Sequence, residues 1–261
     1  MKEILQERAG ASMIRFIWLD LGYTLVKTHR EEVYFKTLQV FDVSKTLDEI
    51  TIAYHLADKL FMREFRGVLG KDSRSFMPWY VGVLNYYLQL SLPIEEIIQV
   101  QQRILKDSVT GWRAFDFSKP TLRYLRELGY KVGLISNWDN TAREVLRRNQ
   151  LDEEMAEIVI SSEVKLEKPD PAIFTYALQK AGVTAQQSLY VGDNYYDDVL
   201  GSRQVGMESL LINPYGKQGI EELDYERVIS SLEELPAYLG HPPKLNLSAC
   251  SVVGGTCHVE N

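Results

Sequence analysis

Cysteine is nearly absent from this chain of 261 residues, and its two cysteines, Cys250 and Cys257, both lie close to the C-terminus. The part expected to fold therefore has no disulfide framework, and we expect a cytoplasmic location. No apolar run approaches the roughly 20 residues that are needed to span a bilayer. The N-terminal segment contains acidic residues and no continuous apolar stretch, so it does not resemble a secretory signal. We therefore expect no membrane partner.

Basic charge is also in short supply. The chain has 29 Lys and Arg against 36 Asp and Glu, a formal net charge of −7. Proteins that bind nucleic acid present a basic face to the phosphate backbone, so nucleic acid is not expected as a partner. Hydrophobic residues make up 45% of the chain, which is enough for one sizeable core with or without a smaller attached domain. We expect a monomer or a homodimer.

Short apolar runs alternate with amphipathic segments over much of the chain. Four runs are predicted to form buried parallel strands, at residues 14–19, 131–135, 188–191 and 209–212. A fifth run, at residues 157–160, is a further candidate. Helices are predicted between or after them at residues 119–128, 140–150, 171–182 and 195–205. This alternation predicts an α/β protein with a doubly wound, Rossmann-like parallel sheet.

Residues 28–112 have a different pattern, with long amphipathic segments and little strand signal. Four helices are predicted there, at residues 30–42, 46–66, 75–90 and 94–108. The block interrupts the α/β pattern after its first strand, so we interpret it as an inserted helical cap domain. The core then comprises residues 12–27 and 113–238.

The last residues, 239–261, are rich in small and polar side chains. They are expected to form a poorly ordered tail. A small disulfide loop or a metal site at Cys250 and Cys257 is left open as an alternative, although two cysteines and one histidine are an incomplete set of metal ligands.

Polar residues follow the predicted strands at the points where the strands end. Asp20 follows the first strand, Ser136 and Asn137 follow the second, and Asp193 follows the third. Lys168 lies between the second and third of these strands. In an open parallel sheet, ligands bind at the carboxyl ends of the strands. Carboxylates, a hydroxyl and an ammonium at one edge suit phosphoryl transfer with magnesium, which prefers oxygen ligands.

Four motifs occur in order along the chain. They are Asp20 to Thr24, LIS at 134–136, the lysine of EKPDPAIF at 167–174, and GDNYYDD at 192–198. Through these motifs the chain resembles the haloacid dehalogenase superfamily of phosphatases, in the subfamily I branch with a helical cap inserted after the first strand. The resemblance covers residues from about 12 to 235 and is weakest in the cap.

The resemblance implies a hydrolase that depends on Mg²⁺ and removes phosphate from a small phosphorylated metabolite through an aspartyl-phosphate intermediate. Asp20 would be the nucleophile and a ligand of the metal. The backbone carbonyl of Gly22 would also face the metal. Asp193 and Asp198 would complete the metal site.

The resemblance also implies how the phosphoryl group is held. Ser136 and Lys168 would bind it directly, with Lys168 and Ser136 acting beside Asp20 in catalysis. Thr24 and Asn137 would shape the loops there and would be substrate-binding residues as well. Trp138, directly after the second motif, is a candidate for the entrance of the site.

The sequence departs from the family pattern at Gly22. The family places a second aspartate two residues after the nucleophile, where it protonates the leaving oxygen and later activates water. Gly22 can offer a backbone carbonyl but cannot transfer a proton. A positioned acid or base typically contributes about 10²–10⁴-fold to the rate, so its loss is serious without being absolute.

Several alternatives remain open for this departure. One is that the leaving group of the substrate needs no acid, and another is that Tyr23 replaces the missing residue. A third is that catalysis is impaired and the protein is a phosphate-binding or regulatory member of the family. A cap lysine that forms a Schiff base, as in the phosphonate-cleaving relatives, is a further alternative, with four candidates that the sequence does not separate: Lys36, Lys45, Lys59 and Lys71. The dehalogenases also lack the second aspartate, but they do not use magnesium, and the retained Gly192-Asp193 pair argues against that chemistry.

Overall fold

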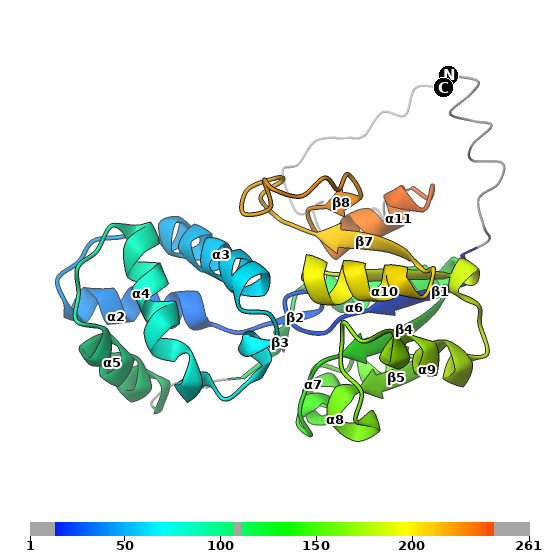
Figure 1. Cartoon of the computed structure of the whole chain (residues 1–261), viewed down its shortest axis with the longest axis horizontal. Coiled ribbons are helices and arrows are strands. Elements are labelled where there is room, and N and C mark those ends of the chain that lie inside the picture. Colours follow the sequence, from blue (N-terminus) through cyan, green and yellow to red (C-terminus); the bar gives the residue numbers. More distant parts are fainter. Residues whose placement is uncertain (1–13, 107–110, 243–261) are drawn as a thin grey trace, which may run out of the picture.

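The computed structural model describes residues 14–106 and 111–242 of the chain. These residues form two parts that lie side by side, an α/β core and a group of four helices (Figure 1). Of the tail predicted at 239–261, residues 243–261 with both cysteines lie outside the described residues, as does the end of the helix predicted at 94–108. No helix within the described ranges is long and apolar enough to cross a membrane.

The core is built on one sheet of six parallel strands. Their order across the sheet is β5 (Glu157–Ile160), β4 (Lys131–Ser136), β1 (Phe16–Leu19), β6 (Ser188–Gly192), β7 (Glu208–Ile212) and β8 (Val228–Ile229). The predicted α/β fold with a parallel sheet is confirmed. All five predicted strands are present, including the one at 157–160. The two-residue edge strand β8 was not predicted.

The side chains of β1 show why the sheet is buried on both faces. Ile17 and Leu19 belong to one hydrophobic cluster, whereas Phe16 and Trp18 belong to another on the opposite face. All four are at most 1% exposed. Successive side chains of a strand point to opposite faces, so a continuous apolar run is what a central parallel strand requires. Each such side chain contributes about 1.5–3 kcal/mol through burial.

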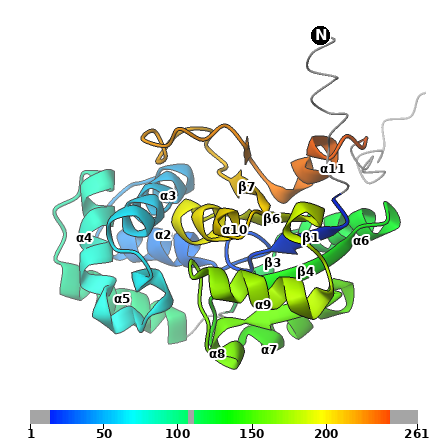
Figure 2. The same ribbon diagram turned by 45° about the vertical axis from the view of Figure 1, so that its right-hand side comes forward.

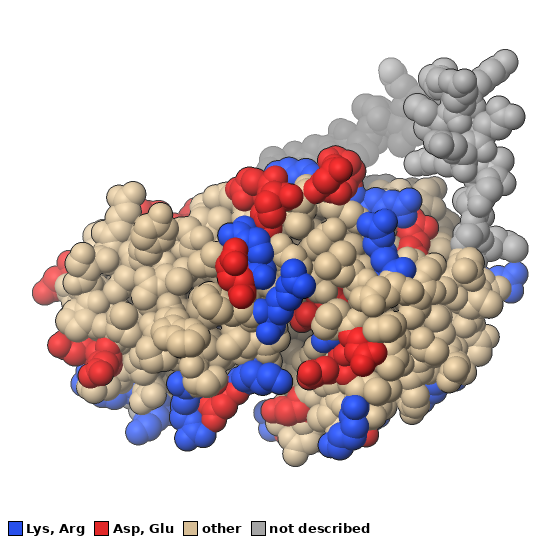
Figure 3. Space-filling model, in the orientation of Figure 1, with Lys and Arg blue, Asp and Glu red and all other residues tan. Residues whose placement is uncertain are grey.

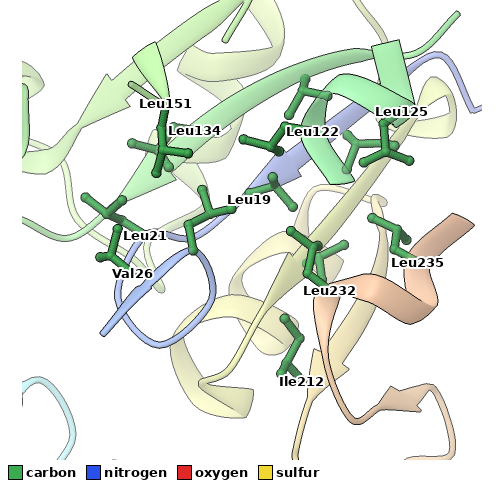
Figure 4. Packing of buried hydrophobic residues seen from close by; sticks show 14 of the residues in the cluster. Leu19, Leu21, Val26, Leu122, Leu125, Leu134, Leu151, Ile212, Leu232 and Leu235 are labelled. Atoms are coloured by element: carbon green, nitrogen blue, oxygen red, sulfur yellow. The ribbon is translucent and has the colours of Figure 1, made fainter. Parts of the chain in front are cut away.

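Helices cover both faces of the sheet. On one face lie α6 (Ser118–Glu127), α7 (Ala142–Arg148), η7 (Leu232–Glu234) and α11 (Leu235–Tyr238), whose leucines meet those of β1 and β4 (Figure 4). On the other lie α9 (Pro171–Ala181) and α10 (Leu200–Gln204), which Figure 2 shows next to each other. Short segments α8 (Ser161–Val164), η4 (Asp152–Glu154) and η5 (Ala185–Gln187) complete the connections.

The four helices of the cap pack around their own hydrophobic cluster. They are α2 (Arg30–Val40), α3 (Leu47–Glu64), α4 (Met77–Leu88) and α5 (Ile94–Lys106), with the short turns η2 (Val68–Gly70) and η3 (Ser73–Ser75) between α3 and α4. The start of α3 is fixed by a capping box. The Thr46 hydroxyl accepts from the Glu49 amide, and the Glu49 carboxylate accepts from the Thr46 amide.

Two strands join the cap to the core. The chain leaves the core through β2 (Val26–Lys27) and returns through β3 (Arg113–Ala114), and these two segments pair with each other in antiparallel register between the two parts (Figure 1). The pairing lies where the sequence analysis divides core from cap. On the face drawn in Figure 3, Lys and Arg side chains are interspersed with Asp and Glu.

Candidate active site

Asp20 lies at the carboxyl end of β1, at the centre of the sheet. Its backbone N–H donates to the carbonyl of Val191 at 3.0 Å, so the residue still belongs to the β-ladder. Its carboxylate oxygen Oδ1 accepts from the hydroxyl of Ser136 at 3.0 Å and from the ammonium of Lys168 at 2.7 Å. Ser136 and Lys168 are 116 and 148 positions from Asp20 in the sequence, yet both donate to this one oxygen atom.

Lys168 is buried and lies between two carboxylates. Its Nζ is 2.7 Å from Asp20 Oδ1 and 2.6 Å from Asp198 Oδ1, and it also donates to the hydroxyl of Tyr190 at 3.0 Å. Burial alone would lower the pKa of Lys168, but the charges of Asp198 and Asp20 outweigh burial and hold its pKa well above the usual value. Lys168 is therefore a positive charge at neutral pH.

Asn137 holds the backbone on which Lys168 sits. Its side-chain amide donates to the Lys168 carbonyl at 2.8 Å and accepts from the Lys168 N–H at 2.8 Å. Both polar atoms of the amide group are thus used to join the end of β4 to the segment before α9. The predicted contact of Asn137 with substrate stays a prediction.

Three carboxylates meet beside this lysine. Asp20, Asp193 and Asp198 each offer an oxygen, and these atoms all lie within 4.8 Å of one another. The Asp198 carboxylate is oriented by the backbone N–H of Asn194, at 2.9 Å. A Cβ atom on Gly192 would lie 2.2 Å from Asp198 Oδ2, so a residue without a side chain is needed immediately before Asp193.

The charge and chemistry of this carboxylate group fit a hard divalent cation. Burial raises the pKa of Asp193 to about 8; the positive charge of Lys59 acts in the opposite direction, and the negative charges of Asp20 and Asp198 add to the rise. Burial also raises the pKa of Asp198. Buried carboxylates that repel one another are stabilised by a cation, and carboxylate oxygens are the ligands that Mg²⁺ prefers. The predicted contribution of the Gly22 carbonyl stays a prediction.

Two tryptophans occupy the space in front of Gly22. A Cβ atom at Gly22 would lie 3.3 Å from Cζ3 of Trp138 and 3.8 Å from Cη2 of Trp112. The two indoles contact each other edge to face, with ring centroids 4.7 Å apart. The place where a side chain at position 22 would begin is therefore lined by aromatic carbon. Trp138 was predicted at the entrance of the site, whereas the part played by Trp112, which precedes β3, was not predicted.

Tyr23 and Thr24 lie in the same loop, and within the described part of the chain neither side chain hydrogen-bonds to the three carboxylates. The hydroxyl of Tyr23 is 3.3 Å from that of Thr28, and its ring lies 4.2 Å from the guanidinium of Arg30. Burial raises the pKa of Tyr23 above its ordinary value. Thr24 is 1% exposed, and its hydroxyl has no hydrogen-bond partner within the described part of the chain. These contacts give no support to Tyr23 as the replacement for the missing acid.

Of the four cap lysines, Lys59 reaches the site. It is 7% exposed, and its Nζ donates to the backbone carbonyl of Asp193 at 2.5 Å. Lys36 and Lys71 are exposed, and Lys45 pairs with Glu49. The sequence does not single out Lys59, because α3 also carries charged residues in its first and last turns, Asp48, Glu49 and Arg63.

Comparison with known proteins identifies the family. A family model described as haloacid dehalogenase-like hydrolase matches residues 39–212. The chain belongs to the haloacid dehalogenase-like hydrolase family. It is 30% identical over 238 residues to haloacid dehalogenase-like hydrolase domain-containing protein 3 of Danio rerio, a match that covers 87% of this chain and 97% of that protein. The family recognised from the four motifs is thus confirmed, and the chain is a hydrolase of this family.

Two further relatives bear on the fold and the chemistry of the family. A glyceraldehyde 3-phosphate phosphatase of Pyrococcus abyssi is 38% identical over 101 residues, which cover 38% of this chain and 42% of that protein. The crystal structure of a phosphatase of this family from Thermococcus onnurineus superposes with a TM-score of 0.52 at 26% identity, covering 88% of this chain and 100% of that chain. Phosphatases are therefore among the proteins similar to this hydrolase.

Proposed function

We propose that this hydrolase is a Mg²⁺-dependent phosphatase that cleaves the phosphate ester of a small metabolite. The observation that carries the proposal is the hydrogen-bonded cluster at Asp20, in which one carboxylate oxygen meets Ser136 and Lys168 beside the carboxylates of Asp193 and Asp198. A nucleophile, two donors for phosphoryl oxygens and a cation site are the parts that phosphoryl transfer requires.

Each residue of this cluster has a separate role in the proposed reaction. A carboxylate oxygen of Asp20 attacks phosphorus and forms the aspartyl-phosphate, which water then hydrolyses. Lys168 and Ser136, which now donate to Asp20, are placed to donate to the phosphoryl oxygens beside it. Asp20, Asp193 and Asp198 would hold Mg²⁺, which when bound neutralises charge on the phosphoryl group.

The class of substrate belongs to the same proposal. The similarity to archaeal glyceraldehyde 3-phosphate phosphatases supports a small phosphorylated metabolite, and triose phosphates are the first natural substrates to assay. The net charge of −7 favours neither nucleic acid nor an anionic membrane surface as a partner. A cytoplasmic location and a monomeric or homodimeric state complete the proposal.

The test is phosphate release from 4-nitrophenyl phosphate, whose leaving group needs little protonation. We expect turnover that requires Mg²⁺ and that falls on the order of 10³-fold or more in Asp20→Asn, because a covalent nucleophile is removed. Asp224→Asn, at an exposed aspartate outside the cluster, is the matched control. Equal rates in the wild type and Asp20→Asn, in a folded protein that binds Mg²⁺, would contradict the proposal and favour a phosphate-binding or regulatory relative.

A further inference from the structure

Lys59 is a buried cation that has no carboxylate partner of its own. Among the described residues, no carboxylate oxygen lies within 4.0 Å of its Nζ, and its hydrogen bond goes to the neutral backbone carbonyl of Asp193. Two other cations of this region differ, because the buried Lys168 pairs with Asp20 and Asp198 and the half-buried Arg30 pairs with Asp58. A buried charge is costly unless it is paired, so an ammonium left in this state indicates a function at the site.

The ammonium is held in place by the docking of α3 on the core. Asp58, the preceding residue, accepts from Arg30 and, at 2.6 Å, from the hydroxyl of Tyr80. On the core side, a Cβ atom at Gly219 would lie 3.1 Å from Cγ of Lys59, so the aliphatic stem of the lysine is pressed against that loop. The ammonium of Lys59 therefore points from the cap toward the carboxylate group rather than into solvent.

Among the described residues, the side chains around Gly22 offer no free proton donor. Gly22 has no side chain, and Trp138 closes the space in front of it. Lys168 is committed to Asp20 and Asp198, and the Tyr23 hydroxyl lies against Thr28. Lys59 has two N–H bonds left after its contact with Asp193. Lys59 belongs to α3 of the cap, so a leaving group that lies between cap and core would meet its ammonium beside Asp193.

We propose that Lys59 is the proton donor for the leaving oxygen, an inference that rests on the phosphatase function proposed above. In the first step Asp20 bonds to phosphorus, the bond from phosphorus to the leaving oxygen breaks with its electron pair going to oxygen, and a proton passes from the Lys59 ammonium to that oxygen. In the second step water attacks phosphorus, its proton passes to the Lys59 amine, and the bond from phosphorus to Asp20 breaks. Ammonium and carboxylate are restored, and the sum is ester plus water giving alcohol plus phosphate.

The experiment compares two leaving groups in the full chain. Lys59→Met keeps the length of the side chain and removes the proton. We expect kcat/KM for an alkyl ester, glycerol 2-phosphate, to fall about 10²–10⁴-fold, and kcat/KM for 4-nitrophenyl phosphate to fall less than about 10-fold. Lys59→Arg keeps the positive charge and a donor to Asp193 but does not release its proton, so the same selective loss is expected with docking of the cap retained.

Lys45→Met, at a cap lysine that pairs with Glu49 on the surface, is the matched control and should leave both rates unchanged. An equal loss with both esters would overturn the inference, because Lys59 would then only dock the cap or bind substrate. A wild type without turnover of either ester would instead overturn the phosphatase function itself.

Discussion

The presence of glycine at position 22 is explained by the side chains packed around it rather than by its backbone conformation. Gly22 is not among the glycines with positive φ, so its conformation does not itself require glycine. What a side chain there would meet is the indole of Trp138, 3.3 Å from the position of a Cβ atom. The family pattern places an aspartate at this position. Its side chain would therefore compete for space with Trp138, which follows the second motif.

This competition predicts a coupling between the two positions. Gly22→Asp alone should lower the free energy of unfolding by about 1–3 kcal/mol, because it overpacks the contact with Trp138. In a Trp138→Ala background the same substitution should cost less, with a coupling of about 1 kcal/mol between the two changes. Denaturant midpoints of the two single variants and the double variant measure this coupling. Strict additivity would show that Trp138 moves aside without cost.

At the level of the elements, buried strands were predictable and irregular segments were not. Every strand of four residues or more coincides with an apolar run, because a strand buried on both faces admits few polar residues. The two residues of β8 are too few to carry a period. The helix predicted at 195–205 is in fact a π-helical turn, η6 (Tyr195–Val199), followed by α10, and sequence periodicity does not reveal such a turn.

One contact between elements has a defined pH dependence. Glu154 in η4 accepts from Arg123 at 2.8 Å and from Arg126 at 2.5 Å, both on α6. Burial would raise the pKa of Glu154, but the hydrogen bonds from both arginines outweigh burial and lower its pKa. A carboxyl whose pKa is lowered by folding stabilises the protein above its ordinary pKa, and this contribution is lost as the pH falls through the lowered pKa.

Glu154→Gln should therefore lower the free energy of unfolding by about 1.5 kcal/mol at pH 7, at the low end for charged hydrogen bonds because both arginines are half-exposed. The difference from wild type should be constant from pH 7 down to about pH 5 and should shrink below about pH 4. Urea denaturation across this range measures it. A difference that stays the same at acid pH would show that packing of the side chain, and not its charge, stabilises the contact.

At the scale of the whole molecule, the sequence predicted the part of the site that the sheet assembles. Asp20 and Asp193 follow β1 and β6, Ser136 is the last residue of β4, and neighbouring parallel strands bring their carboxyl ends together. The part that the cap contributes could not be predicted, because it depends on how α3 packs against the core loops. Lys36, Lys45, Lys59 and Lys71 are equivalent as sequence, and only the docking of α3 distinguishes Lys59.

The same assembly predicts that a divalent cation stabilises the folded chain as a whole. The three carboxylates follow or flank two different strands and come together only on folding, so Mg²⁺ should bind the native state and not the unfolded chain. At a Mg²⁺ concentration 100 times the Kd, the free energy of unfolding should rise by about 2.7 kcal/mol, which corresponds to an increase in Tm of about 5 °C or more. Thermal unfolding with Mg²⁺ and with EDTA measures the effect without any assay of activity.

Asp193→Asn should abolish most of the increase in Tm. Glu153→Gln, at an exposed acid, and Lys59→Met, which removes no carboxylate, should retain it. An unchanged increase in Asp193→Asn would place the cation elsewhere and remove the metal from the proposed chemistry.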